Sequence, residues 1–101
     1  MNLRDLARDQ DCTVRLESVC NCNPETTVLA HFRMIDISGA GMKSSDLLGA
    51  WACSACHDAI DRRAHMDLDR DFVQLAHLKG VMRTQAQLLK RGVLRLTTKK
   101  D

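Results

Sequence analysis

Residues 52–61 read Ala-Cys-Ser-Ala-Cys-His-Asp-Ala-Ile-Asp, and this stretch decides which fold to expect. Cys53 and Cys56 are separated by two residues, the spacing at which a tight turn presents two thiolates to one tetrahedral Zn²⁺. His57 and Asp61 are four residues apart and would lie on one face of the helix that follows the turn. One short segment can therefore serve two metal ions, a structural one bound by sulfur and a catalytic one bound by nitrogen and oxygen.

The chain holds five cysteines, and four of them form the predicted structural zinc site: Cys12, Cys20, Cys53 and Cys56. Zn²⁺ prefers four soft donors in a tetrahedron where it stabilises a fold. The segment between Cys12 and Cys20 is long enough for a small hairpin that turns both thiols inward. Cys22 is the alternative to Cys20, and buried apolar cysteines are the alternative to a metal site. We favour zinc because so many thiols fall in one short chain.

Composition predicts one cytosolic domain. At 101 residues the chain has the usual size of a single domain, and its aromatic side chains are only two Phe and one Trp. A metal staple would help a core that depends on Leu, Val, Ile and Met. No apolar run is long enough to cross a bilayer and the first residues do not resemble a signal peptide, so we expect reduced thiols and no membrane partner. The formal net charge is only +2, although the residues from Lys79 onward are mostly basic.

Hydrophobic periodicity and turn residues predict the elements of the first two thirds of the chain. The β-branched and apolar residues at 26–32 should form a strand with His31 near its end. Ser45 or Asp46 is the expected cap of a short helical stretch. In chain order we expect helical turns at 3–8, a strand or the arm of a thiol-bearing loop at 13–16, a strand at 26–32, a helical stretch at 47–51 and a helix at 54–63.

The last third of the chain predicts an amphipathic helix. Gly80 is expected to interrupt this helix, and Gly92 is expected to end it. The apolar residues that recur at helical spacing are Phe72, Leu75, Ala76, Met82, Ala86 and Leu89.

His31, His57 and Asp61 form a second set of candidate functional residues, with Arg33, Arg62 and Arg63 close in sequence. Hydrolysis of a phosphodiester needs a base that activates water, a cation that stabilises the negative charge of the transition state, and basic groups that bind the backbone. A neutral imidazole at His31 suits the base. The pair His57 and Asp61 suits a divalent ion, because the carboxylate supplies the hard oxygen that Mg²⁺ or Mn²⁺ prefers.

Each of these residues also has a structural interpretation. Asp61 can pair at the surface with Arg62, Arg63 or Lys43. His57 can be the fourth zinc ligand in place of a distant cysteine, and His31 can be a core histidine whose ring is hydrogen-bonded.

A His that closes a strand, a Gly-containing loop and a Cys-x-x-Cys-His helix together resemble the HNH, or ββα-metal, nuclease family. The match is closer to the small nucleases of that superfamily carried by phages and prophages, on the segments Cys20–Thr26 (CNCNPET), Leu29–His31 (LAH) and Ala52–Asp58 (ACSACHD). The resemblance runs from Leu3 to the segment Arg83-Thr84-Gln85. It implies an α+β, zinc-stapled ββα-metal domain with an additional C-terminal helix or helices, His31 as general base, and His57 and Asp61 as ligands of Mg²⁺, Mn²⁺ or Zn²⁺.

The resemblance divides the single domain 1–101 into an N-terminal segment 1–11, a zinc and ββα-metal core 12–63, and a C-terminal helical extension with a basic tail 64–101. The implied function is a metal-dependent endonuclease that cleaves DNA in a bacterial host cell. The alternative is a zinc-stabilised nucleic-acid-binding module of the same fold without catalytic activity.

The chain departs from the family pattern at three positions. Many members carry a metal-binding Asp or His just before the base, where this chain has Ala30. The central Asn that often fixes the base-bearing loop has no clear counterpart, and Asp46 is the nearest polar candidate. The last motif position, often His or Asn, is Asp61. These differences imply that metal binding at the catalytic site is weak, is completed by ligands borrowed from Asp36 or Asp46, or is lost.

Overall fold

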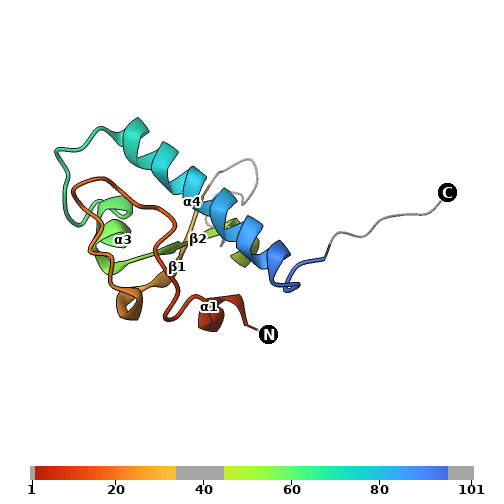
Figure 1. The fold of residues 1–101 in the computed structure, drawn as a ribbon. Coiled ribbons are helices and arrows are strands. Elements are labelled where there is room, and N and C mark those ends of the chain that lie inside the picture. The colour runs from red at the N-terminus through yellow and green to blue at the C-terminus, as the bar shows by residue number, and fades with distance from the viewer. Residues whose placement is uncertain (1, 34–44, 96–101) are drawn as a thin grey trace.

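The computed structural model describes residues 2–33 and 45–95 and forms a small mixed α+β domain (Figure 1). A two-stranded sheet lies beside one long helix and several short helical segments. The elements are α1 (Leu3–Leu6), η1 (Pro24–Thr26), β1 (Val28–His31), η2 (Asp46–Leu48), β2 (Gly49–Ala52), α3 (Ser54–Ile60) and α4 (Arg70–Lys90), where η denotes a 3₁₀ turn.

Strands β1 and β2 pair in antiparallel register, with Val28 opposite Ala52 and His31 opposite Gly49. A two-stranded sheet is not stable alone in water and needs a covering element. Helix α4 supplies it by packing across β2, and α3 begins directly after β2 (Figure 1). The sheet therefore presents His31 at the end of β1 while its inner face lies against α4.

The predicted helical stretch at 47–51 is correct in its Ser45 cap and its first turn but wrong from Gly49 onward. A 3₁₀ turn at Asp46–Leu48, capped by the Ser45 hydroxyl, is followed at once by strand β2. All four residues of β2 are buried, and the Trp51 position pairs with Leu29 of β1. Burial between β1 and α4 therefore overrides the local tendency of the Leu-rich, Ala-rich sequence to form a helix.

The sequence left two options for residues 13–16, a strand or the arm of a thiol-bearing loop. In the structure, residues 12–16 form a loop arm. This arm lies along the edge of β2 that β1 does not cover. The Thr13 N–H donates to the Trp51 carbonyl at 2.7 Å, and the Thr84 hydroxyl of α4 accepts from the Trp51 N–H at 3.0 Å. The open edge of the sheet is thus closed by one loop residue and one helix residue.

Helix α4 is continuous through Gly80, contrary to the predicted interruption. A Cβ atom at Gly80 would lie 2.9 Å from Val14 Cγ2 and 3.1 Å from the Cβ of Ala50, so glycine permits the loop arm and β2 to approach the helix. Gly92 follows the end of α4 with φ of +74°, as predicted for a helix-terminating glycine.

The core face of α4 also differs from the prediction. The side of the helix that contacts the sheet carries Val73, His77, Gly80, Val81, Thr84 and Leu88. Phe72, Leu75, Met82 and Leu89 are exposed, Ala86 is exposed, and only Ala76 of the predicted set is partly buried. In the ranges 2–33 and 45–95, no helix is both long and apolar enough to cross a membrane.

Candidate functional site

Four cysteines converge at the start of α3. Cys53 is the N-cap of the helix and Cys56 lies in its first turn, while Cys12 and Cys20 come from the loop that precedes β1. Their Sγ atoms all lie within 4.8 Å of one another, and the Cys53 and Cys20 sulfurs are 3.8 Å apart. Four sulfurs about 2.3 Å from one Zn²⁺ would be separated from each other by about 3.8 Å. The donor set therefore fits a single tetrahedral metal ion.

Backbone N–H groups point at these sulfurs. The Asn21 and Cys56 N–H groups donate to Cys53 Sγ at 3.5 and 3.4 Å, and the Arg15 N–H donates to Cys12 Sγ at 3.5 Å. Such donors stabilise negative charge on sulfur and hold the ligands in place. The four thiols also act on one another: a hydrogen bond from the Cys56 thiol lowers the pKa of Cys12 to about 4 and correspondingly raises the pKa of Cys56. Burial raises the pKa of Cys20 to about 12.

Cys22 lies beside this group without joining it. Its thiol is exposed and its Sγ is 3.9 Å from that of Cys20, but it is outside the set of four sulfurs that surround one point. The geometry accordingly favours Cys20 over Cys22 as the fourth sulfur.

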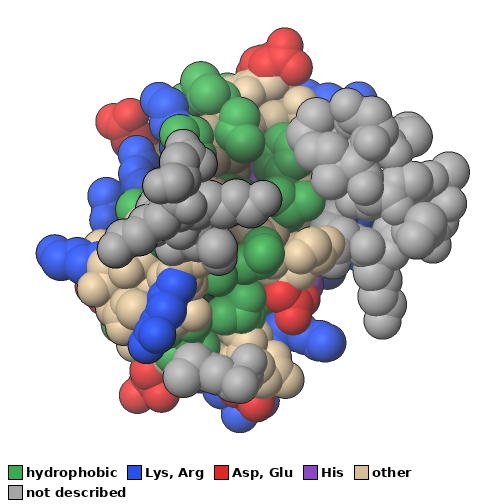
Figure 2. Space-filling view, turned by 90° about the vertical axis from the view of Figure 1, so that its right-hand side faces the viewer, with side chains coloured by type: hydrophobic (Ala, Val, Ile, Leu, Met, Phe, Trp, Pro, Cys, Tyr) green, Lys and Arg blue, Asp and Glu red, His purple; other side chains and the backbone are tan. Residues whose placement is uncertain are grey.

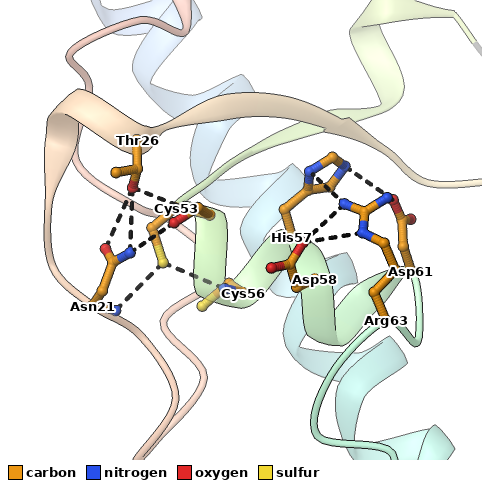
Figure 3. A network of polar contacts seen from close by, with 9 residues as sticks. Asn21, Thr26, Cys53, Cys56, His57, Asp58, Asp61 and Arg63 are labelled. Atoms are coloured by element: carbon orange, nitrogen blue, oxygen red, sulfur yellow. Dashed lines mark hydrogen bonds and ion pairs between the residues drawn. The ribbon is translucent and has the colours of Figure 1, made fainter.

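The turn between Cys20 and β1 is tied to the first turn of α3 (Figure 3). The Asn21 amide donates to the Ser54 hydroxyl at 3.0 Å, and the Ser54 N–H donates to the Thr26 hydroxyl at 3.1 Å. The second of these bonds satisfies a backbone N–H that the start of a helix leaves without a partner. Both bonds also fix the approach of the Cys20 loop to Cys53.

His31 forms a second centre at the end of β1. Its Nε2 lies 2.7 Å from Asp46 Oδ1, and Arg4 Nε lies 3.6 Å from the other carboxylate oxygen. The hydrogen bond with His31 lowers the pKa of Asp46, so this carboxylate is ionised and acts as an acceptor. Nε2 must then carry the proton, which leaves the lone pair on Nδ1. Asp46 thus holds the His31 ring in the tautomer that a base requires.

His31 and Asp61 line the same hollow, whose volume is about 410 Å³. The hollow lies between the end of β1, the end of α3 and the first half of α4. Its other lining residues are Phe32, Arg33, Ile60, Arg63, Val73, Gln74 and His77. A candidate base, a candidate metal ligand and two arginines therefore share one solvent-accessible space.

His57 does not line this hollow itself, but its side chain contacts that of Asp61, which does. The two side chains project from α3 one turn apart, with 3.2 Å between His57 Nε2 and Asp61 Oδ2 (Figure 3). The Arg63 guanidinium lies against both, 3.1 Å from the Asp61 carboxylate and 3.4 Å from His57 Nδ1. It also pairs with Asp58 at 2.9 Å. His57 is not part of the four-cysteine group, and the surface pairing of Asp61 with Arg63 is realised.

The three predicted arginines have different surroundings. Arg33 is exposed at the hollow, and Arg63 lies at its rim with the partners described above. Arg62 points elsewhere: its Nη2 donates to the carbonyls of Met66 and Leu68 at 2.8 and 3.1 Å. Arg62 therefore fixes the turn after α3. Asp36 and Lys43, considered above as a borrowed ligand and an ion-pair partner, lie outside the described residues.

His77 is a residue of the hollow that sequence reasoning missed. It is buried, and because a carbonyl can only accept, its Nε2 donates the 2.8 Å hydrogen bond to the Ala30 carbonyl. Its ring packs on Phe32 with 5.0 Å between centroids, and burial lowers its pKa. The sequence does contain a signal for the burial of His77. This residue is four positions from both Val73 and Val81, so all three side chains lie on the same face of a helix.

The fold and these two centres define a small α+β domain with a candidate four-thiolate metal site beside a hollow that contains a carboxylate-supported histidine. The chain belongs to the YbcO family, whose model, described as "Putative nuclease YbcO", matches residues 1–93. It is 49% identical over 94 residues to "Putative nuclease YbcO" of Escherichia coli (strain K12) and equally to "Putative nuclease ybcO" of Enterobacteria phage 82. Each alignment covers 93% of this chain and 97% of the relative.

A solved structure has the same fold. It is described as "Structure of a putative bacteriophage protein from Escherichia coli str. K-12 substr. MG1655" and is 47% identical in sequence. The TM-score is 0.77, with 90% of this chain and 100% of that chain covered. Family membership confirms the sequence-based resemblance to small proteins of bacteria and phages that are described as "Putative nuclease".

Proposed function

We propose that this chain is a metal-dependent endonuclease that hydrolyses DNA phosphodiester bonds on a ββα-metal, HNH-like fold. The observation that carries the proposal is the hollow shared by His31, Asp61, Arg33 and Arg63. The order of strand, strand and helix around it, β1–β2–α3, is the order that the family resemblance implies. The proposed partner is the DNA backbone, and the proposed location is the cytoplasm of the bacterial host.

His31 is the proposed general base. With Nε2–H held by the Asp46 carboxylate at 2.7 Å, Nδ1 keeps its lone pair and can take a proton from the attacking water. The carboxylate then stabilises the imidazolium that forms, as an orienting acid does in other His-dependent hydrolases. Asp46 therefore fills, from a different sequence position, the role of the missing family Asn.

His57 and Asp61 are the residues that would hold a divalent ion, Mg²⁺, Mn²⁺ or Zn²⁺. Such an ion stabilises the charge that builds on the phosphate and the leaving oxygen. One nitrogen and one carboxylate oxygen are donors of the right kind, but the Arg63 guanidinium already pairs with the Asp61 carboxylate and donates to His57 Nδ1. Metal binding requires this guanidinium to move toward Asp58 or toward a bound phosphate. Arg33 and Arg63 are then the candidate phosphate contacts.

The four-cysteine site is proposed to hold a structural zinc. Its ligands join the loop at Cys12 and Cys20 to the first turn of α3, so it fixes the helix that carries His57 and Asp61. Four protein ligands leave no open position, which suits a structural role and not a catalytic one.

A nuclease assay tests the proposal. Wild-type protein, incubated with supercoiled, linear and single-stranded DNA in Mg²⁺, Mn²⁺ or Zn²⁺, should cleave at least one substrate. His31→Ala should lower the cleavage rate by roughly two to four orders of magnitude with zinc content and DNA affinity unchanged, because a base acts in the transition state. Cleavage by His31→Ala at the wild-type rate would overturn the mechanism.

The pairing of Arg63 with His57 and Asp61 favours a second candidate function, a zinc-stabilised DNA-binding module without turnover. In that case the Arg63 guanidinium permanently occupies the place beside His57 and Asp61 that a catalytic metal ion would take. Protein that binds DNA in a salt-dependent manner but cleaves nothing with any of the three ions would select this second function.

A further inference from the structure

Helix α4 has a second apolar face that points away from the core. The buried residues of this 21-residue helix lie on one side, whereas five large apolar side chains on the other side are exposed: Phe72, Leu75, Leu78, Met82 and Leu89. At 100° per residue they recur every three or four positions and form one continuous stripe, with exposed Ala86 completing it. We refer to these six residues as the α4 stripe.

The stripe is a concentrated surface feature. Figure 2, which views the molecule from the side of the C-terminal end of α4, shows that hydrophobic side chains are exposed on this face together with several Lys and Arg side chains. An apolar stripe of this length, roughly 26 Å from Phe72 to Leu89 at 1.5 Å per residue, is the kind of surface that another helix covers. The stripe also lies away from the hollow, because Val73, Gln74 and His77 line the hollow from the other sides of α4.

We propose that the α4 stripe is the interface of a homodimer in which two α4 helices pack antiparallel. The pattern is self-complementary about a twofold axis that passes between Gly80 and Val81. At the same level along such a pair, Phe72 of one copy meets Leu89 of the second copy, and Leu75 meets Ala86. Each of these two outer layers thus contains one larger and one smaller apolar side chain, which suits close packing of two helices, while in the two layers nearer the axis Leu78 is level with Arg83 and Met82 with Lys79.

The charges at the two ends of α4 also match a second copy of the chain. Asp71 lies in the first turn and Lys90 in the last turn. The antiparallel arrangement places Asp71 of each copy level with Lys90 of the other, whereas a parallel arrangement would place like charges together. Lys79, which flanks the stripe near the axis, lies level with Met82 of the second copy and can extend its ammonium into solvent.

A small hollow beside the stripe provides the remaining contact. It has a volume of about 200 Å³ and lies between the loop arm at Val14 and Leu16 and the α4 residues Phe72, Leu75 and Ala76. Leu89 of the second copy is at the level of this hollow. A side chain from the twofold partner can therefore fill a space that its own chain leaves open.

Sedimentation velocity over a range of concentrations tests the proposal. The mass should move from 11.3 kDa toward twice that value as concentration rises. Met82→Lys should raise the dimer dissociation constant by roughly tenfold or more, because the new ammonium would lie in the apolar seam level with Lys79 of the second copy. Met66→Lys is the matched control: Met66 is 68% exposed and Met82 64% exposed, but Met66 is not on α4. A chain that stays monomeric, or equal weakening by both substitutions, would overturn the proposal.

Charge reversal tests the antiparallel arrangement. Asp71→Lys and Lys90→Asp should each weaken self-association, since each places like charges together at both ends. A mixture of the two variants should instead form a heterodimer, because both ends of that pair regain opposite charges. Circular dichroism of each variant checks that α4 is retained. A mixture that associates no better than the separate variants would rule out the antiparallel second copy as the occupant of the stripe.

Discussion

The hydroxyl oxygens of Thr13 and Thr84 lie 2.9 Å apart in the core, although the two residues are 71 positions apart in the chain. Thr13 Oγ1 also lies 3.0 Å from the Trp51 carbonyl, to which it donates, so Thr84 donates to Thr13 and accepts from the Trp51 N–H. Every hydrogen of this small network has one acceptor. A loop, a strand and a helix are thereby joined at one buried point.

Thr84→Val should destabilise the domain by about 1–3 kcal/mol, because it leaves the Trp51 N–H buried without an acceptor. Thr84→Ser keeps the hydroxyl and serves as the matched control. Urea unfolding followed by Trp51 fluorescence measures the difference. Equal stability of the two variants would show that the network contributes nothing to the folded state.

Gly80→Ala should also destabilise the domain, although alanine favours a helix by up to about 1 kcal/mol over glycine. The new Cβ would lie 2.9 Å from Val14 Cγ2 and 3.1 Å from the Val14 Cα, and a buried backbone atom cannot move aside as a flexible side chain can. A cost of about 1–3 kcal/mol is usual for overpacking, so the net change is a loss. Thermal unfolding of Gly80→Ala beside wild type checks the sign.

Asp46→Ala should lower cleavage more than Asp46→Asn. Both substitutions remove the negative charge that stabilises the His31 imidazolium, but the Asn carbonyl still accepts from Nε2–H and keeps the ring oriented. The cleavage rates of the two variants, compared at saturating DNA, measure the separate contributions of orientation and charge. Identical rates would mean that Asp46 does not position the base.

Zinc content should depend on Cys20 and not on Cys22. Cys20→Ser, Cys53→Ser and Cys56→Ser should each lose the metal and unfold, whereas Cys22→Ser should retain one Zn²⁺ per chain, as measured by elemental analysis. Retention by Cys20→Ser together with loss by Cys22→Ser would reverse the assignment of the fourth ligand.

Acid should release the same zinc. The pKa of Cys20 is raised to about 12 and that of Cys56 is raised as well, so both bind protons in the metal-free protein and must lose them to bind zinc. Binding therefore releases protons, and affinity falls as the pH falls. A titration with a chromogenic chelator at several pH values follows this release. A zinc affinity that stays constant as the pH falls would contradict thiolate ligation.

The local motifs were predictable from the sequence because their partners lie a few residues away. The helix that begins at Ser54 was predicted from its start, and β1 was predicted with its end close to His31. The proximity of the four cysteines followed from the chemistry of thiols in one short chain. The contact of His31 with Asp46 could not be derived, because it depends on how the chain returns between β1 and η2.

The errors arise where tertiary packing overrides a local pattern. Residues 47–51 have helix-forming composition, yet burial between two elements makes 49–52 a strand. On α4 the larger apolar residues occupy the solvent face, so the pattern identified the helix but selected the wrong side. Half of the buried side consists of the small or polar residues Gly80, Thr84 and His77, whose partners lie in distant segments.

The bond between Thr13 and Thr84 bears on how this chain is made. At 5–20 residues per second, a ribosome needs roughly 4 to 14 s to extend the chain from the first threonine to the second. β2 cannot close its open edge until Thr84 has been added, and the four cysteines precede α4 in the chain, so they are synthesised before the helix that completes the core. If these cysteines bind zinc as proposed, the metal site would be complete in sequence before the core is, and the supply of zinc in the host cell would influence how much of the new protein reaches the native state.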